Sequence, residues 1–231
     1  MVVHTAGIGS PDYAEQNREE SWDVNIGGTS NMLALCEKHN ARLIYISPNG
    51  IFDGKKAPYD ENDVPEPINY YGELKFKGEG LLENAKTPCS IVRPILMYGW
   101  NNTFERSNIA TYALSKLSKG EGVQVYDDIF VTPLFSNSCA EAIWKIVEEE
   151  KYDVFNIAGA ERASIYQMIL KMAEIFDLDT NLVEAVQQGF FNELVPRPID
   201  TSFRTNKMEN VLKLKPLSLH AGFSAMKLLG T

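Results

Sequence analysis

The sequence has few cysteines, a deficit of cations and no long apolar run. Its three cysteines, Cys36, Cys89 and Cys139, are odd in number and far apart, which predicts reduced core residues rather than a disulfide framework or a metal site. With 22 Lys and Arg against 31 Asp and Glu, the net charge of −9 argues against a nucleic-acid partner, because phosphate binding needs a basic face. No run of about 18 apolar residues could span a membrane, and the first residues lack the basic region of a signal peptide. We therefore expect an acidic, cytoplasmic protein with no nucleic-acid or membrane partner and no metal.

The hydrophobic pattern predicts an α/β fold with a parallel sheet. Apolar residues make up 44% of the chain and charged residues 23%, as in an ordinary globular protein. The predicted strands are residues 1–4, 43–47, 90–93, 123–126 and 154–157. The predicted helices are residues 12–39, 70–84, 109–119, 138–150 and 164–176. Strands that alternate with helices of this length are typical of βαβ units. Residues 187–231 contain three prolines and are predicted to hold little regular structure before a last short helix.

The most informative local pattern is the pair Tyr71 and Lys75 within the predicted helix 70–84. A spacing of four places the two side chains on one helix face, one turn apart. An ammonium beside a phenol favours the phenolate, so we expect a Tyr71 pKa lowered toward neutrality, which suits proton transfer at a carbonyl or alcohol carbon. The spacing by itself is weak evidence, because it arises often by chance and usually marks a solvated helix face. A functional interpretation therefore depends on the surrounding sequence.

Several further strings occur in a fixed order around this pair. They are Val2 to Gly7, Val24-Asn25 with Gly28-Thr29 and Asn31, Leu43 to Gly54, Tyr59-Asp60-Glu61, Pro65-x-Pro67-x-Asn69, Gly78-Glu79, Arg93-Pro94, Tyr98-Gly99, Asn156 to Gly159, and Pro196-Arg197-Pro198. In this combination the sequence resembles the extended short-chain dehydrogenase/reductase family, and most closely its dTDP-4-dehydrorhamnose reductase (RmlD-like) branch. The resemblance covers essentially the whole chain.

The resemblance implies a Rossmann-like, doubly wound parallel sheet that is N-terminally truncated and carries a small C-terminal α/β substrate lobe. Residues 1–100, with 138–158 returning to them, would form the remaining NAD(P)-binding domain. Residues 101–137 and 159–231 would form the lobe that binds a nucleotide-sugar. The cofactor would be NADP or NAD, with no readable preference.

The same resemblance implies the catalytic roles. Tyr71 would be the general acid/base, Lys75 would hold the nicotinamide ribose and tune Tyr71, and Asn25 would anchor a water in the proton relay. An alternative for Asn25 is that it only bonds backbone groups in its own packing.

The binding residues are implied in the same way. His4, Ala6, Gly7 and Pro94, together with Tyr71 and Lys75, would line the cofactor, although a histidine at the end of a buried strand is more often a satisfied core residue. Arg197 would contact the substrate diphosphate, or would be a surface arginine between two prolines.

One departure from the family pattern is the absence of its glycine-rich turn. The Gly-x-x-Gly-x-x-Gly turn, whose helix N-terminus binds the pyrophosphate, has no counterpart here. The missing βαβαβ half would be on the order of 60 residues. Its loss would leave residues 1–4 as a bare sheet edge, an aggregation or pairing liability. Three explanations remain open. The protein lacks this half, or the sequence is truncated, which the position of Met1 directly before the first strand favours. In the third, a partner chain or a second copy of this chain covers the sheet edge.

A second departure affects the substrate carbonyl. Pro48 stands where the family has a catalytic Thr or Ser, and proline offers neither a hydroxyl nor an amide hydrogen. Ser47 is adjacent but should face away, because side chains alternate along a strand. Asn49 could donate to the substrate only if its loop bends unusually. By analogy with an oxyanion donor, the missing hydroxyl would cost about 10²–10³ in rate.

Three functions are consistent with these features. The first is an NAD(P)H-dependent reductase of a nucleotide-linked 4-keto sugar, which the Tyr71, Lys75 and Asn25 set favours. The second is a non-catalytic binding or regulatory protein on the same scaffold, similar to the beta subunit of methionine adenosyltransferase, which Pro48 and the missing turn favour. The third is a nucleotide-sugar epimerase or dehydratase, which fold analogy alone does not exclude.

Overall fold

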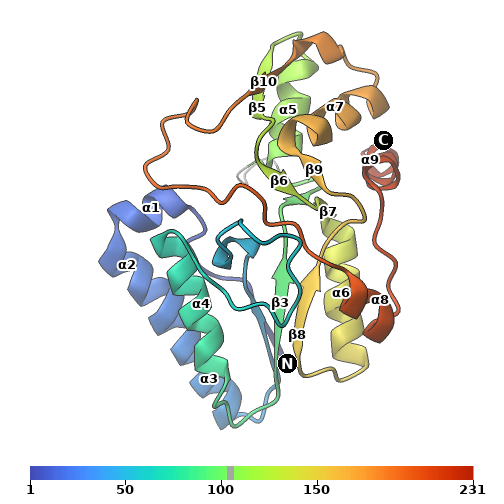
Figure 1. Cartoon of the computed structure of the whole chain (residues 1–231). Coiled ribbons are helices and arrows are strands. Elements are labelled where there is room, and N and C mark those ends of the chain that lie inside the picture. Colours follow the sequence, from blue (N-terminus) through green and yellow to red (C-terminus); the bar gives the residue numbers. More distant parts are fainter. Residues whose placement is uncertain (103–106, 231) are drawn as a thin grey trace.

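The centre of the molecule is a parallel sheet. The computed structural model describes residues 1–102 and 107–230. Within them, the strands β1 (Val2–His4), β2 (Leu43–Ile46), β3 (Cys89–Pro94) and β8 (Val154–Ile157) form a four-stranded sheet in the order β1-β2-β3-β8 (Figure 1). Val2 pairs with Leu43, Leu43 with Cys89, and Ile91 with Val154, so the carboxyl ends of the strands meet at one edge.

One face of the sheet is covered by the helices that separate β1, β2 and β3. They are α1 (Pro11–Gln16), α2 (Arg18–Trp22), a π-helical turn (Asp23–Gly27), α3 (Gly28–Lys38) and α4 (Tyr70–Leu82). The single helix predicted over 12–39 is wrong in detail, because the chain leaves helical geometry at Asn17, whose amide donates to the Tyr13 carbonyl. Cys36, Leu43, Tyr45 and Leu82 form the apolar cluster on this face.

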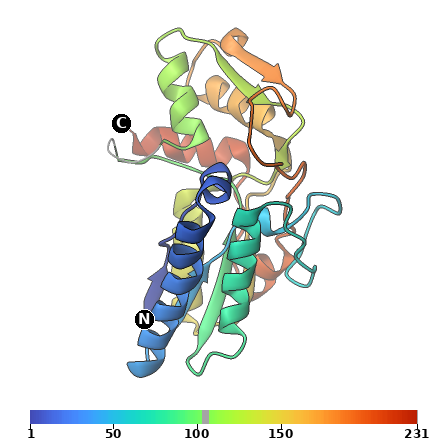
Figure 2. The same ribbon diagram turned by 90° about the vertical axis from the view of Figure 1, so that its left-hand side faces the viewer.

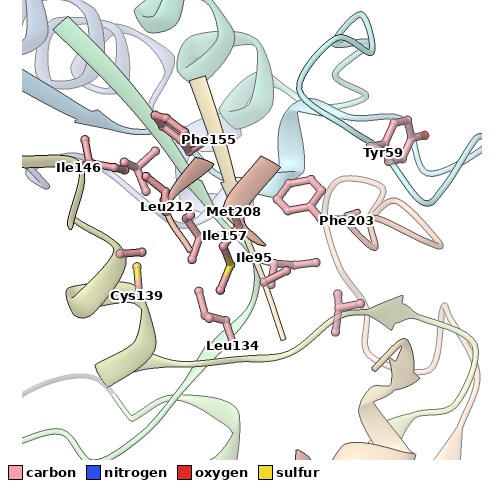
Figure 3. Packing of buried hydrophobic residues seen from close by; sticks show 14 of the residues in the cluster. Tyr59, Ile95, Leu134, Cys139, Ile146, Phe155, Ile157, Phe203, Met208 and Leu212 are labelled. Atoms are coloured by element: carbon pink, nitrogen blue, oxygen red, sulfur yellow. The ribbon is translucent and has the colours of Figure 1, made fainter. Parts of the chain in front are cut away.

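The other face is covered by α6 (Ser136–Glu148) and α8 (Asn206–Val211), which makes the sheet doubly wound (Figure 1). Figure 3 shows how Ile146, Phe155, Ile157, Met208 and Leu212 pack together there. Helix α8 lies in the tail that was predicted to hold little regular structure before its last helix. It was missed because Met208 is its only buried residue, so the sequence shows no helical periodicity. Phe203 joins the same cluster, although it lies in the range predicted for the lobe.

A smaller lobe sits beyond the carboxyl ends of the strands (Figures 1 and 2). Its helices are α5 (Ile109–Leu117), α7 (Ile165–Ile175) and α9 (Leu219–Leu229), and a parallel pair of strands, β5 (Val123–Tyr126) and β10 (Val183–Val186), packs with α7. Strand β10 has no counterpart among the predicted elements. Ser164 and Gln167 form a capping box at the start of α7, as a serine ahead of an apolar stripe predicts.

Short strands join the lobe to the sheet. They are β4 (Met97–Tyr98), β6 (Phe130–Val131), β7 (Leu134–Phe135) and β9 (Ala163–Ser164), with β4 paired to β7 and β6 paired to β9. Residues 103–106 and 231, which belong to the predicted lobe, lie outside the described residues. The predicted α/β class with a parallel, doubly wound sheet is confirmed.

Three further features concern the described ranges. All three cysteines are free thiols, of which Cys36 and Cys139 are buried. The described helices include none that is both long and apolar enough to cross a bilayer. The same residues hold no group of three or more His, Cys, Asp or Glu side chains placed to bind a metal ion.

Candidate functional site

A first cavity lies at the carboxyl ends of β1, β2 and β3. Its volume is about 220 Å³. The lining residues are Thr5, Gly7, Ile8, Gly9, Asn25, Ile46, Pro48, Asn49, Tyr71, Lys75, Pro94, Ile95, Leu96 and Met97. In open parallel sheets this edge is where ligands bind, because the loops that leave the strands diverge there.

Helix α4 brings Tyr71 and Lys75 to this cavity together. Asn69 caps the helix, since its Oδ1 accepts from the Gly72 amide at 3.0 Å. A Cβ at Gly72 would collide with the Gly50 carbonyl, so the first turn of α4 packs directly against the loop after β2. Tyr71 and Lys75 therefore lie on a face of α4 that packs against the protein, and not on a solvated face.

Lys75 is a buried cation beside the cavity. Its side chain is 8% exposed and its Nζ lies 4.1 Å from the centroid of the Tyr45 ring. Burial lowers the pKa of Lys75 to about 8, and the Glu79 carboxylate offsets part of that effect. Glu79 is itself held by Arg93 in a bidentate pair at 2.9 and 2.6 Å. Nζ has no hydrogen-bond acceptor among the described residues. The hydroxyl groups of a ligand in this cavity would provide such acceptors.

The expected lowering of the Tyr71 pKa is wrong for this structure. Burial raises the pKa of Tyr71 to about 12. The reason is that desolvation disfavours the phenolate, while the Lys75 ammonium is placed against the Tyr45 ring. Tyr71 is therefore held as a neutral phenol.

Asn25 lies in the π-helical turn and lines the first cavity. Its Oδ1 accepts from the Ile8 amide at 3.0 Å and its Nδ2 donates to the Ile8 carbonyl at 3.3 Å. Asn25 thus makes the backbone contacts expected if its role is structural. They hold the loop after β1 against the π-helical turn. A Cβ at Gly7 would lie 2.6 Å from Asn25 Oδ1, which explains the glycine there.

The other predicted cofactor residues are distributed unevenly. Gly7 and Pro94 line the first cavity, whereas His4 and Ala6 do not. His4 is buried, shares a 3.1 Å hydrogen bond with the Thr29 hydroxyl, and has a pKa lowered by burial and then by the Lys75 charge. Ala6 is exposed.

A second cavity of about 410 Å³ continues from the first toward the lobe. Gly9, Pro48, Asn49, Tyr71 and Leu96 line both cavities. The far wall of the second includes residues of the lobe and of residues 187–205, here called the strap, which runs from the lobe past α1 to α8 (Figure 1). The strap contributes Glu193, Arg197, Pro198 and Thr201.

Polar contacts tie the strap to both parts of the molecule. Arg197 pairs with Asp12 of α1 at 2.9 Å, and the Asn69 amide donates to the Pro196 carbonyl at 3.1 Å. On the lobe side the Tyr126 hydroxyl donates to Glu193, and burial together with this carboxylate raises the Tyr126 pKa to about 12.

The predicted substrate residues Asn49 and Arg197 both line the second cavity. Asp12 and Thr201 were missed, and no motif could have found them, because their partners lie on distant segments.

The side chains of Ser47 and Pro48, directly after β2, face opposite sides, as strand alternation predicts. Pro48 lines both cavities, while Ser47 is fully buried and belongs to neither lining. Asn49 begins a 3₁₀ turn (Asn49–Ile51), and its Nδ2 donates to the Thr201 hydroxyl at 2.5 Å. Asn49 therefore lines both cavities, with its amide donating to Thr201.

Comparisons with known proteins extend over nearly the whole chain. The family described as RmlD substrate binding domain matches residues 1–226. Methionine adenosyltransferase 2 subunit beta of Rattus norvegicus is 27% identical over 189 residues, which are 78% of this chain and 56% of that protein. This chain thus spans little more than half the length of that curated relative.

Two solved structures show the same fold. The dTDP-4-dehydrorhamnose reductase of Bacillus anthracis, solved in complex with NADP, superposes with a TM-score of 0.90 at 24% identity, over 98% of this chain and 79% of that one. A dTDP-4-dehydrorhamnose reductase of Clostridium acetobutylicum also gives a TM-score of 0.90, at 22% identity, over 100% of this chain and 81% of that one.

Proposed function

This chain belongs to the RmlD substrate binding domain family, and from that membership we propose that it is an NAD(P)H-dependent reductase of a nucleotide-linked 4-keto sugar. The observation that carries the proposal is the position of Tyr71, which lines both cavities where they join, with Lys75 one turn along the same helix. A proton donor at such a junction can serve a carbonyl in one cavity while a hydride arrives from the other.

The first cavity suits the nicotinamide and ribose end of a dinucleotide. Lys75 presents a buried ammonium without an acceptor among the described residues, and ribose hydroxyls would accept its hydrogen bonds. A nicotinamide cofactor, when bound, supplies the hydride. The glycine-rich turn for a pyrophosphate has no counterpart among these 231 residues, so the proposal assigns only this end of the cofactor. Either NADP or NAD is compatible with it.

The proton is the contribution of the chain itself. Because burial holds Tyr71 as a neutral phenol at pH 7, it is in the state required to protonate the oxygen of a 4-keto group. Lys75, with a pKa of about 8, is charged at neutral pH, and in this proposal its ammonium binds the ribose hydroxyls one turn along α4 from Tyr71. Asn25 holds the loop of Ile8 at the cavity wall.

The second cavity suits the sugar and its diphosphate. It lies between the sheet and the lobe, and Arg197 is the cation on its wall. We assign Arg197 to the diphosphate, in exchange for its present partner Asp12. The proposed division therefore has residues 1–100 and 138–158 on the cofactor side and residues 101–137 and 159–231 on the substrate side, except that Phe203 and α8 pack on the sheet. The free thiols suit a reducing compartment, and we assign the protein to the cytoplasm.

A second candidate function is that of a non-catalytic subunit. Pro48 lines both cavities at the position where the carbonyl-polarising hydroxyl is expected, and the curated relative reported above is itself described as a subunit. A subunit of this kind would bind a dinucleotide or nucleotide-sugar without turnover.

The test is turnover of dTDP-4-dehydrorhamnose, followed by the absorbance of NADPH and, separately, of NADH. We expect Tyr71→Phe to lower kcat by about 10²–10⁴-fold, since it removes the proton donor. The matched control is Tyr70→Phe, because the Tyr70 hydroxyl donates to the Arg18 carbonyl and lines neither cavity. Equal rates for the Tyr71 variant and the wild type would contradict the catalytic role. A folded wild type that binds the dinucleotide but does not turn over would favour the subunit.

A further inference from the structure

The site lacks a hydroxyl where Pro48 stands, yet a different hydroxyl reaches the second cavity from the strap. Thr201 lines that cavity together with Pro48, Asn49 and Tyr71. We propose that Thr201 donates the hydrogen bond that polarises the substrate carbonyl, in place of the missing Thr or Ser after β2. The inference rests on the proposed reductase function.

The backbone fixes where Thr201 lies. Its amide donates to the Phe130 carbonyl at 3.1 Å, and the preceding Asp200 forms a β-bridge with Phe130. Thr201 is only 2% exposed, so it has little freedom to move. A donor held in this way costs little reorganisation when charge develops on an oxygen in the cavity.

The hydrogen bond to Asn49 leaves the Thr201 proton available. Asn49 Nδ2 donates to Thr201 Oγ1 at 2.5 Å, so the hydroxyl oxygen is used as an acceptor. A hydroxyl accepts and donates at the same time. No described residue accepts the Thr201 proton, and leaving a buried donor unmet is unfavourable. An oxygen atom in the cavity would satisfy it.

The same turn connects Thr201 to Tyr71. Asn49 is followed by Gly50, where a Cβ would lie 3.9 Å from the Tyr71 ring. Thr201, the Asn49–Ile51 turn and Tyr71 thus follow one another along the cavity wall. The proposal places the substrate carbonyl oxygen at this wall, where it would accept hydrogen bonds from the Thr201 and Tyr71 hydroxyls. In the reduction, hydride adds to C4 and the proton of Tyr71 passes to the oxygen, while Thr201 donates its hydrogen bond without losing its proton.

The test uses steady-state turnover of dTDP-4-dehydrorhamnose by the 231-residue chain. We expect Thr201→Val to lower kcat by about 10–10³-fold with NADPH binding unchanged, as for the loss of an oxyanion donor. Thr201→Ser keeps the donor and retains most of the rate. Asn49→Asp retains the hydroxyl but turns its proton toward the carboxylate, so kcat falls as in Thr201→Val. Pro48→Thr introduced into Thr201→Val restores at least about ten-fold of the lost rate.

The matched control is Ser202→Ala, since Ser202 is buried next to Thr201 but lines neither cavity. If the wild type turns over and both Thr201→Val and Asn49→Asp match it, the inference fails and the reductase function stands. A loss in Thr201→Val with normal Asn49→Asp and no rescue by Pro48→Thr shows a packing role and also overturns it. If Thr201→Val does not fold, Asn49→Asp alone decides. A wild type without turnover overturns the reductase function and this inference with it.

Discussion

The two cavities of this protein are built in different ways. The first is lined by residues at and after the ends of β1, β2 and β3, by α4 and by Asn25 of the π-helical turn, all within residues 5–97. The second needs the lobe and the strap, and its ties join residues as far apart as Asp12 and Val195, 183 positions along the chain. Local spacing therefore identifies the Tyr71–Lys75 pair of the first cavity, whereas the lining of the second depends on contacts between distant segments of the chain.

The two cavities also differ in how they hold their cations. Lys75, at the first, is buried and has no ion pair with a carboxylate of the described residues, while the nearby Glu79 is paired with Arg93. Arg197, at the second, is partly exposed and paired with Asp12. A ligand in the first cavity can therefore accept hydrogen bonds from Lys75 directly. A ligand in the second must compete with Asp12 for Arg197.

Replacing the cation of the first cavity should have the largest effect. We expect Lys75→Met to lower turnover by about 10²–10³-fold, because the proposed ribose contact beside Tyr71 is lost and the cofactor is no longer held in position. At pH 7 the same variant should be more stable by about 1–3 kcal/mol, since it removes the cost of burying an ammonium. Lys77→Met is the control, because Lys77 is exposed on the same helix.

The pH dependence sharpens this prediction. The Lys75 pKa is lowered from 10.5 to about 8 in the folded protein, so between those values the unfolded chain binds more protons. The stability of the wild type therefore rises across that window, and the advantage of Lys75→Met shrinks from pH 8 to 10.5. Urea unfolding of both proteins at neutral and alkaline pH measures this difference in the free energy of unfolding. A variant less stable than the wild type at pH 7 would show that Lys75 stabilises the fold.

A smaller effect is expected at the second cavity. Asp12→Asn removes the carboxylate that competes for Arg197 but keeps an Oδ1 to accept from the Val195 amide, 3.3 Å away. We expect the affinity for dTDP to rise about 3- to 10-fold and to become more sensitive to salt. Isothermal titration at low and high ionic strength measures both. The control is Glu15→Gln, which breaks the surface pair with Arg18; equal gains in the two variants would mean a general charge effect.

The smallest effect is expected at Asn69, which serves both cavities. Its Oδ1 caps α4, which carries Tyr71, while its Nδ2 holds the strap at Pro196. Asn69→Asp keeps the cap and loses the donor, so we expect unchanged thermal stability and a KM for the nucleotide-sugar raised about 2- to 5-fold. Asn108→Asp is the matched control, because Asn108 caps α5 and donates to the Gly99 carbonyl away from both cavities. A falling kcat with constant KM would show that α4 has shifted.

Part of the site could be predicted because helix and strand periodicity are local. The helix predicted over 70–84 is present as Tyr70–Leu82, and Tyr71 and Lys75 reach one cavity. Ser47 faces away from it, as strand alternation requires. The predicted direction of the Tyr71 pKa shift is wrong. The spacing indicates that a cation is near, but it does not indicate how deeply the phenol is buried.

The sequence by itself determined the α/β order of the chain, the parallel sheet and the Tyr71–Lys75 pair, since each depends on contacts within a few residues or on the alternation of βαβ units. Only the tertiary structure decided which side chains complete the second cavity. The hydrogen bond from Asn49 to Thr201 joins residues 152 positions apart, and no periodicity in the sequence links them. It also decided the pKa values of Tyr71 and Lys75, because desolvation is a property of the packed surroundings and not of the residues themselves.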